Sequence, residues 1–305
     1  MHSFIDRLAA GVRARKTPTL VGLDPRAESL PAGFLAADQQ RNPAAVAEAF
    51  RLFSRAVVDV VAPLVAVVKP QAAFFEECGP AGMVALGDVV SYARSKGLLV
   101  IVDGKRNDIG STATAYAEAY LGARSPWGAD ALTVSPYLGD DSLTPFVDVA
   151  HRNDAGIFVL VKTSNPGGRM LQDLVVDGRP IYRHVGDHVE QLAAQGTGEC
   201  GYGAVGAVVG ATYPAQLTEL RTALKHTWFL VPGFGAQGGT ARDVAGGFDD
   251  CGLGAIVNNS RGIIFAHAAK AYKEKFGDAR WQEAVEAATR DMIAQLQADT
   301  PAGRL

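Results

Sequence analysis

The pattern that decides the fold lies at residues 98–121, LLVIVDGKRNDIGSTATAYAEAYL. Its first part, residues 98–103, is a short apolar run, which is typical of a strand buried on both faces and therefore of a parallel sheet. A charged turn follows, and the alanine-rich residues 109–121 favour a helix. The stretch predicts one strand–helix unit, with charged side chains placed where the strand ends.

The same alternation extends over the rest of the chain, where seven more apolar runs are each followed by a helical pattern. The predicted strands are residues 19–23, 65–69, 131–134, 156–162, 203–209, 228–231 and 254–257. The predicted helices are residues 45–61, 81–96, 142–152, 181–195, 215–224, 241–246, 263–276 and 281–297. Strict alternation indicates an α/β fold, and eight units favour a closed (β/α)8 TIM barrel over an open sheet. No change of composition marks a linker, so we expect a single domain over residues 1–305 with an extra C-terminal helix.

The overall charge and the cysteines limit the classes of function. The net charge of −3 gives no general attraction for nucleic acid or for an anionic membrane, so we expect neither as a partner. Cys78, Cys200 and Cys251 are far apart and form neither a disulfide framework nor a CxxC metal motif, which favours a cytoplasmic location. The sequence contains neither the apolar segment of a signal peptide nor a run of about 18 apolar residues.

Polar residues follow the predicted strands, at the edge where (β/α)8 barrels carry their active sites. Asp24 follows the first strand and Lys69 ends the second. Asp103 and Lys105 follow the third, and alternation along a strand that continued so far would turn both toward the barrel interior together with Ile101. We therefore expect these charged side chains to gather at one rim of the barrel.

Two lysines and two aspartates, Lys69, Asp103, Lys105 and Asp108, would form an alternating network at this rim. A carboxylate beside each lysine keeps the lysine protonated, so that it can donate a proton. A carboxylate fixed beside a substrate anion raises the energy of that anion, and loss of neutral carbon dioxide would relieve the repulsion. The residues thus suit removal of a carboxylate followed by protonation of carbon. The alternative is a solvated turn with an ion pair worth ~0–1 kcal/mol.

Two polar loops, residues 233–239 and 258–262, follow the seventh and eighth predicted strands. Phosphate sites in such barrels commonly use these loops, since glycines let backbone N–H groups approach the oxygens and Arg261 can donate paired hydrogen bonds. The GxGxxG spacing of the first loop also matches a dinucleotide fingerprint. That fingerprint belongs near the first strand of a domain and needs an acid at the end of the next strand, which is missing here. We therefore expect a phosphate site, with two tight turns as the alternative.

Two other features stand apart from this rim. His184 and His188 are four residues apart on a predicted helix, but no acid lies between them in the HExxH manner, so we expect no metal site there. Residues 163–178 form a longer connection than a strand and a helix usually need, and long loops of this kind often serve as lids or binding loops.

The segment 100–112 resembles the signature of orotidine 5′-phosphate decarboxylase, in which apolar residues precede Asp-x-Lys-x-x-Asp-Ile-Gly-x-Thr. Residues 232–239 and Arg261 resemble the phosphate-binding loops of that family and occur in the expected order. Residues 162–167 and the C-terminal helix resemble its longer bacterial branch, type 2. The resemblance covers the barrel from Asp24 to Arg261.

This resemblance implies that the chain converts orotidine 5′-phosphate (OMP) to UMP in de novo pyrimidine biosynthesis, with neither a metal nor an organic cofactor. Lys105 would protonate C6 of the pyrimidine after carbon dioxide leaves, and Asp103 would crowd the substrate carboxylate. Lys69 and Asp108 would complete the charged network.

The resemblance also implies a homodimer with shared active sites, because Asp108 and Thr112 would reach into the site of the neighbouring subunit. The implied substrate contacts are the ribose for Asp24 and Lys69, the edge of the base for Ser164, and the phosphate for Gln237 and Arg261.

Two alternatives remain at this point. A related sugar-phosphate decarboxylase on the same barrel also carries Asp-x-Lys-x-x-Asp, but it uses magnesium and has an acid where this chain has Lys69. Thr112 also argues against that enzyme. The second alternative is a barrel that binds a phosphorylated ligand without turning it over, in which the charged residues would form a stabilising cluster.

Overall fold

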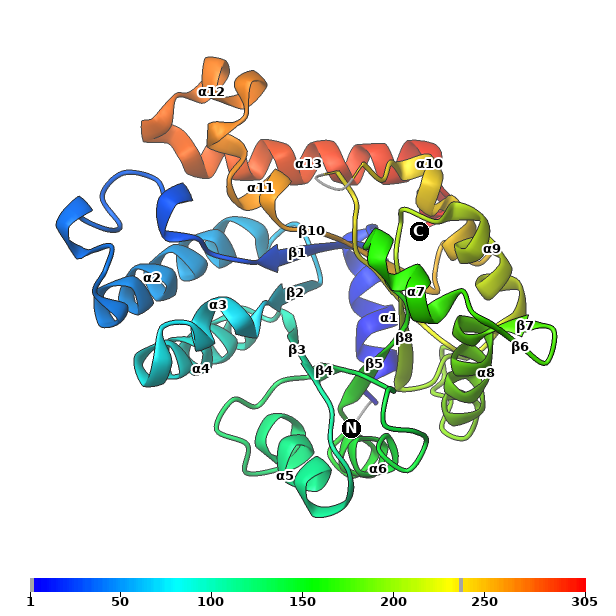
Figure 1. Cartoon of the computed structure of the whole chain (residues 1–305). Helices are drawn as coiled ribbons and strands as arrows, with labels where there is room; N and C mark the ends of the chain where they lie inside the picture. Colours follow the sequence, from blue (N-terminus) through cyan, green and yellow to red (C-terminus); the bar gives the residue numbers. More distant parts are fainter. Residues whose placement is uncertain (1–2, 236–237) are drawn as a thin grey trace.

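The computed structural model describes residues 3–235 and 238–305 and contains a closed barrel of eight parallel strands (Figure 1). Consecutive barrel strands pair in chain order, and the last, β10, pairs with β1 to close the barrel. The barrel strands are β1 (Thr19–Leu23), β2 (Val67–Pro70), β3 (Leu99–Arg106), β4 (Ala131–Val134), β5 (Gly156–Lys162), β8 (Val205–Val209), β9 (Phe229–Val231) and β10 (Ala255–Asn259). The predicted (β/α)8 fold is confirmed.

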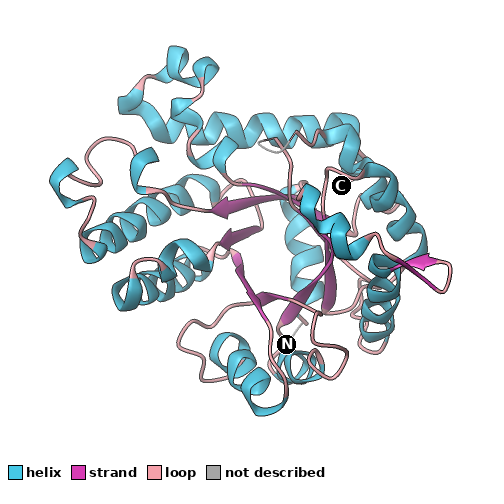
Figure 2. Ribbon diagram, viewed as in Figure 1, coloured by secondary structure: helices cyan, strands magenta, loops and turns pink. Residues whose placement is uncertain are grey.

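Helices surround the strands and cover the outer face of the barrel (Figure 2). They are α1 (Phe4–Arg15), α2 (Pro43–Val61), α3 (Ala72–Glu76), α4 (Gly79–Ser95), α5 (Gly110–Leu121), α6 (Thr144–Arg152), α7 (Arg169–Gln172), α8 (Ile181–Ala194), α9 (Pro214–Ala223), α10 (Ala241–Val244), α11 (Arg261–Ile264), α12 (Lys270–Phe276) and α13 (Trp281–Asp299). The predicted extra C-terminal helix is α13, and Trp281 at its start packs on Phe53 of α2 with ring centroids 5.3 Å apart. None of the described helices is long and apolar enough to span a membrane.

The barrel interior is filled by apolar side chains and closed at one end by α1. Inward-facing Ile101 and Phe158 form one buried cluster with Phe4 and Leu8 of this helix. Helix α1 was not predicted, although its buried residues recur at helical spacing and the Ser3 hydroxyl accepts a hydrogen bond from the first turn. Because α1 covers the end at which the strands begin, a ligand has access from the end at which they finish.

Two predicted segments differ from the structure. The predicted helix 263–276 is broken by a 3-10 turn at Ala266–Ala268, where the side chains of Phe265 and His267 are both buried. Residues 163–178, predicted as a loop, contain α7 and part of a two-stranded antiparallel hairpin. The hairpin strands are β6 (Val175–Val176) and β7 (Arg179–Pro180).

Candidate active site

A cavity of about 440 Å³ opens at the carboxyl ends of the barrel strands. Its apolar wall includes Leu160, Val208 and Leu230, which pack on the inner core of the barrel. The polar residues that line it are Asp24, Lys69, Gln71, Asp103, Lys105, Thr133, Thr163, Ser164, Asn165, Asn258, Asn259, Ser260 and Arg261. Six of the residues predicted from sequence therefore lie around one cavity, namely Asp24, Lys69, Asp103, Lys105, Ser164 and Arg261.

Asp103 joins the charged side chains of this cavity and is held by four of its neighbours. Its Oδ2 accepts hydrogen bonds from Nζ of Lys69 (2.7 Å) and from Nε2 of Gln71 (3.0 Å). Its Oδ1 accepts hydrogen bonds from Nζ of Lys105 (2.6 Å) and from the hydroxyl of Thr133 (2.8 Å). An ionised carboxylate offers about four acceptor positions. With four donors around it, the carboxylate of Asp103 is held in one orientation.

Burial and charge act against each other at Lys69 and Asp103. Burial alone would lower the pKa of Lys69, but the carboxylates of Asp103 and Asp24 outweigh burial and raise this pKa above its ordinary value. Burial would raise the pKa of Asp103, but the neighbouring ammonium groups of Lys69 and Lys105 and their hydrogen bonds hold it well below its usual range. At neutral pH Asp103 is therefore an anion and Lys69 a cation.

Lys105 has a backbone conformation that is rare for residues with a side chain. Its φ of 45° lies in the left-handed region, which costs about 1–2 kcal/mol for an L-residue. Its backbone N–H donates to the hydroxyl of Thr133 (2.9 Å), and the guanidinium of Arg106 donates to the carbonyl of Gly104 (2.7 Å). The pairing of β3 with β4 shifts register here, so Lys105 reaches the cavity through a left-handed turn and not through regular strand alternation. Its side chain is 47% exposed and still reaches Asp103.

Two buried oxygens at the cavity have no hydrogen-bond partner among the described residues. They are Oδ1 of Asp24, directly after β1, and Oδ1 of Asn258 in β10. Buried polar atoms without a partner are few in native proteins. Hydroxyl groups of a bound ligand could donate hydrogen bonds to both oxygens.

The loop after β9 contributes residues 232–234 to the cavity, and the end of β10 together with the residues that follow it contributes residues 258–261. Gly233 and Gly235 have φ values of 98° and 71°, which residues with side chains rarely adopt, so this loop depends on its glycines. Arg261 is exposed at the start of α11 and lines the same cavity. Gln237, the other residue predicted to bind phosphate, lies outside the described residues.

The segment after β5 forms a further wall of the cavity through Thr163, Ser164 and Asn165. The carbonyl of Ser164 accepts a hydrogen bond from the hydroxyl of Thr212 (2.9 Å). Ser164 also passes so close to Gly210, directly after β8, that a Cβ added there would lie 2.7 Å from its Cα. The position of Ser164 therefore depends on the neighbouring segment after β8.

Asp108 and Thr112 do not line the cavity of their own chain. Oδ1 of the half-buried Asp108 accepts a hydrogen bond from the backbone N–H of Ile109 (2.8 Å). Thr112 is exposed on α5. The structure thus separates these two residues from the other predicted site residues.

Within residues 3–235 and 238–305, no group of three His, Cys, Asp or Glu side chains is arranged to hold a metal ion. Nε2 of His184 in α8 lies 2.9 Å from the carbonyl oxygen of Val176 in the hairpin.

Residues 20–276 match the sequence profile of a family described as "Orotidine 5'-phosphate decarboxylase / HUMPS family". The chain belongs to this family. A relative from Rhodopirellula baltica, named orotidine 5′-phosphate decarboxylase, is 56% identical over 301 residues, which are 97% of this chain and 100% of the relative. A relative of the same name from Deinococcus radiodurans is 41% identical over 265 residues, which are 87% of this chain and 90% of the relative.

Solved structures agree with this membership of the OMP decarboxylase family. The Leishmania donovani OMP decarboxylase is 34% identical with a TM-score of 0.74, and the match covers 97% of this chain and 98% of that one. The Leishmania donovani UMP synthase is 35% identical with a TM-score of 0.77, and the match covers 98% of this chain and 57% of that longer one.

Several polar residues of the cavity were not among the individual site residues predicted from sequence, and Gln71, Thr133 and Asn258 are three of them. Signals for them exist in the sequence. Thr133 interrupts the apolar run 131–134, and Asn258 follows the apolar run 254–257 directly. Gln71 lies two positions after Lys69, which on a strand places it on the same face.

Proposed function

We propose that this chain converts OMP to UMP, a step of de novo pyrimidine biosynthesis, by removing the carboxylate and protonating C6. The observation that carries the proposal is the buried carboxylate of Asp103 between Lys69 and Lys105, at a cavity of a chain 56% identical to an OMP decarboxylase. The substrate is therefore a phosphorylated nucleotide.

In the proposed reaction the substrate carboxylate lies beside Asp103. Four hydrogen bonds hold Asp103 in place, so it cannot turn away, and two neighbouring carboxylates repel each other. Breaking the bond between C6 and the carboxylate releases neutral carbon dioxide and leaves the electron pair on C6. The repulsion falls as this happens, so it favours the transition state over the bound substrate.

Lys105 then donates a proton from Nζ to C6. The vinylic anion at C6 has no ring position into which it can delocalise, so nearby fixed cations must stabilise it. Lys69 and Lys105, whose Nζ atoms lie 2.7 and 2.6 Å from the two oxygens of Asp103, are those cations. Their positive charge serves the purpose that a metal ion or an organic cofactor serves in other decarboxylases, and the proposal needs neither.

The remaining residues of the cavity bind the parts of the substrate that do not react. Asp24 accepts a hydrogen bond from a ribose hydroxyl, which satisfies its buried oxygen, and Lys69 also contacts the ribose. Ser164 contacts the edge of the base, and Arg261 and Gln237 bind the phosphate. Binding energy from the phosphate, far from C6, can then support the unfavourable arrangement of charges at C6.

We also propose a homodimer with shared active sites. The resemblance to the family implies that Asp108 and Thr112 reach into the site of a neighbouring subunit, and neither residue lines the cavity of its own chain. Mixing the inactive variants Lys105→Ala and Asp108→Asn tests this arrangement. Half of the dimers would be hybrids with one intact site, so activity should recover to about a quarter of the wild-type value. Two variants that stay inactive after exchange of subunits would contradict shared sites.

Residues 1–305 are proposed to form one domain that works in the cytoplasm. The domain assignment is supported by α1 and α13, because these helices lie near opposite ends of the chain and both pack into hydrophobic core clusters of the same barrel. We expect one cooperative unfolding transition in urea. Two separate transitions would contradict a single domain.

The test of the function is the loss of ultraviolet absorbance of OMP on addition of the purified protein. We expect turnover in metal-free buffer and the same rate with EDTA. Turnover that EDTA abolishes would favour the magnesium-dependent alternative, and an absorbance that stays constant would favour a barrel that binds without turnover.

A further inference from the structure

Lys162, the last residue of β5, carries a buried charge that the proposed reaction does not use. Its side chain is 0% exposed, and Nζ pairs with the carboxylate of Asp173 in the segment 163–178. The aromatic rings of Tyr182 and Tyr213 also lie near, with centroids 5.5 and 4.4 Å from Nζ. Among the described residues Asp173 is the carboxylate paired with this ammonium group, so this ion pair compensates for its burial.

After Lys162 the chain leaves the barrel, forms α7 and folds back, so that Gln172 at the end of α7 contacts Thr163. Gln172 also closes this loop, since its Oε1 accepts a hydrogen bond from the backbone N–H of Thr163 (3.0 Å). Its Nε2 donates to the hydroxyl of Thr163 (2.8 Å). Ser164, which comes next, lines the cavity. The hydrogen bonds between Gln172 and Thr163 thus hold the segment directly before Ser164, which forms part of the cavity wall.

We propose that Lys162 and Asp173 are positioning residues whose ion pair holds Ser164 in the place where it meets the base of the substrate. This inference rests on the proposed function, which gives Ser164 its role. Neither Lys162 nor Asp173 lines the cavity, so both act through the loop.

The burial of Lys162 explains why its ion pair favours the closed loop. If the loop moved outward, Asp173 would leave with it, and Lys162 would remain as a buried charge without compensation, which is strongly unfavourable. The side chain of Asp173 is already 40% exposed and would regain water easily. The ion pair therefore favours the closed position of the loop before the substrate binds. The entropy cost of ordering this loop during binding is then smaller.

Two variants and one control test this inference. Asp173→Asn and Lys162→Met each remove the ion pair. Lys162→Met leaves no buried charge behind, so it provides the test even if Asp173→Asn does not fold. Asp177→Asn is the matched control, because Asp177 belongs to the same segment and forms no ion pair with the described residues.

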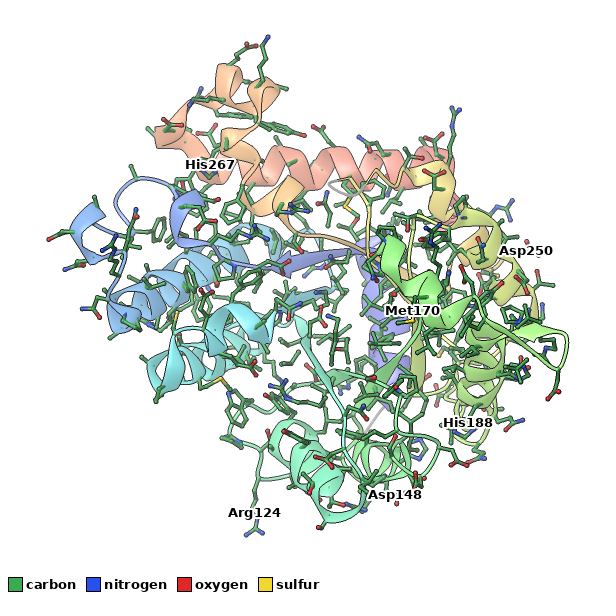
Figure 3. All side chains as sticks on the ribbon, in the orientation of Figure 1. Arg124, Asp148, Met170, His188, Asp250 and His267 are labelled. Carbon is green, nitrogen blue, oxygen red and sulfur yellow. The ribbon has the colours of Figure 1, made fainter. Side chains whose placement is uncertain are left out.

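The first measurement is tryptic cleavage after Arg169, which is exposed in α7. Figure 3 labels its neighbour Met170, whose side chain is 77% exposed. The second is KM and kcat for OMP. We expect both ion-pair variants to be cleaved faster than wild type and to show a KM raised roughly tenfold with a smaller change in kcat. The control should match wild type in both measurements.

Wild-type cleavage and KM in both ion-pair variants would overturn the inference, and so would a control that changes as much as they do. Cleavage requires no turnover. An inactive wild-type protein would therefore contradict the proposed function, while the cleavage rates would still decide whether the ion pair holds the loop.

Discussion

The hydroxyl of Thr133 in β4 links the two residues on which the proposed reaction depends most. It donates a hydrogen bond to Asp103 (2.8 Å) and accepts one from the backbone N–H of Lys105 (2.9 Å), and Thr133 is 1% exposed. Thr133→Val replaces the hydroxyl with a methyl group of similar size. The packing of β4 is then kept while both hydrogen bonds are lost.

The expected loss of activity follows from these two bonds. A hydrogen bond to a charged group contributes about 1.5–3 kcal/mol. The left-handed backbone of Lys105, which costs about 1–2 kcal/mol, also loses a contact that holds it. If the loss of the bond to Asp103 falls entirely on the transition state, kcat falls by roughly 10- to 150-fold, because each 1.36 kcal/mol changes a rate tenfold. Thr133→Ser keeps the hydroxyl and should keep kcat within about threefold of wild type.

Both variants are compared with wild type by the absorbance assay for kcat and KM and by urea unfolding. We expect Thr133→Val to lower kcat with little change in KM, because the hydrogen bonds of Thr133 go to Asp103 and to the backbone of Lys105, and not to the residues proposed to bind ribose or phosphate. A wild-type kcat in Thr133→Val would refute the reasoning, and so would a Thr133→Ser variant that loses as much as Thr133→Val.

Three further predictions concern the charged residues. Lys105→Ala should keep its circular dichroism spectrum and lose turnover, and a kcat near wild type would exclude Lys105 as the proton donor. Arg261→Ala should raise KM for OMP roughly 10- to 100-fold through loss of charge-assisted hydrogen bonds, and an unchanged KM would argue against a phosphate role. Asp103→Asn should unfold at a lower urea concentration than wild type at pH 7, because Lys69 loses its anionic partner. The pKa of Asp103 is lowered by folding, so its contribution is full above the unfolded value of about 3.9 and is lost as the pH falls below it. The difference between wild type and Asp103→Asn should therefore narrow at pH 3, and a constant difference would contradict this assignment.

The barrel could be predicted because its strands are apolar runs and a helical pattern follows each of them. The rim positions of Asp24, Lys69 and Asp103 follow from the same pattern, since a charged residue at the end of a buried strand has to lie at the edge of the sheet. Helix α1 was missed because the eight strand–helix units already account for a complete barrel. The apolar face of α1, which includes Phe4, packs against the barrel interior that this helix covers.

Details that depend on residues far apart in the chain could not be predicted. The left-handed turn at Lys105 is held by Thr133, 28 positions later, and strand alternation gives no sign of it. The ion pair of Lys162 with Asp173 likewise depends on how α7 folds back over the end of β5. Both arrangements arise from tertiary contacts, whereas periodicity reports the local environment of each segment.

The most direct test of the account is the product formed from OMP by the purified protein in metal-free deuterated buffer, followed by nuclear magnetic resonance. Because the ammonium protons of Lys105 exchange with solvent, the account predicts one UMP for each OMP consumed, with deuterium at C6. OMP that remains unchanged, or UMP without deuterium at C6, would contradict it.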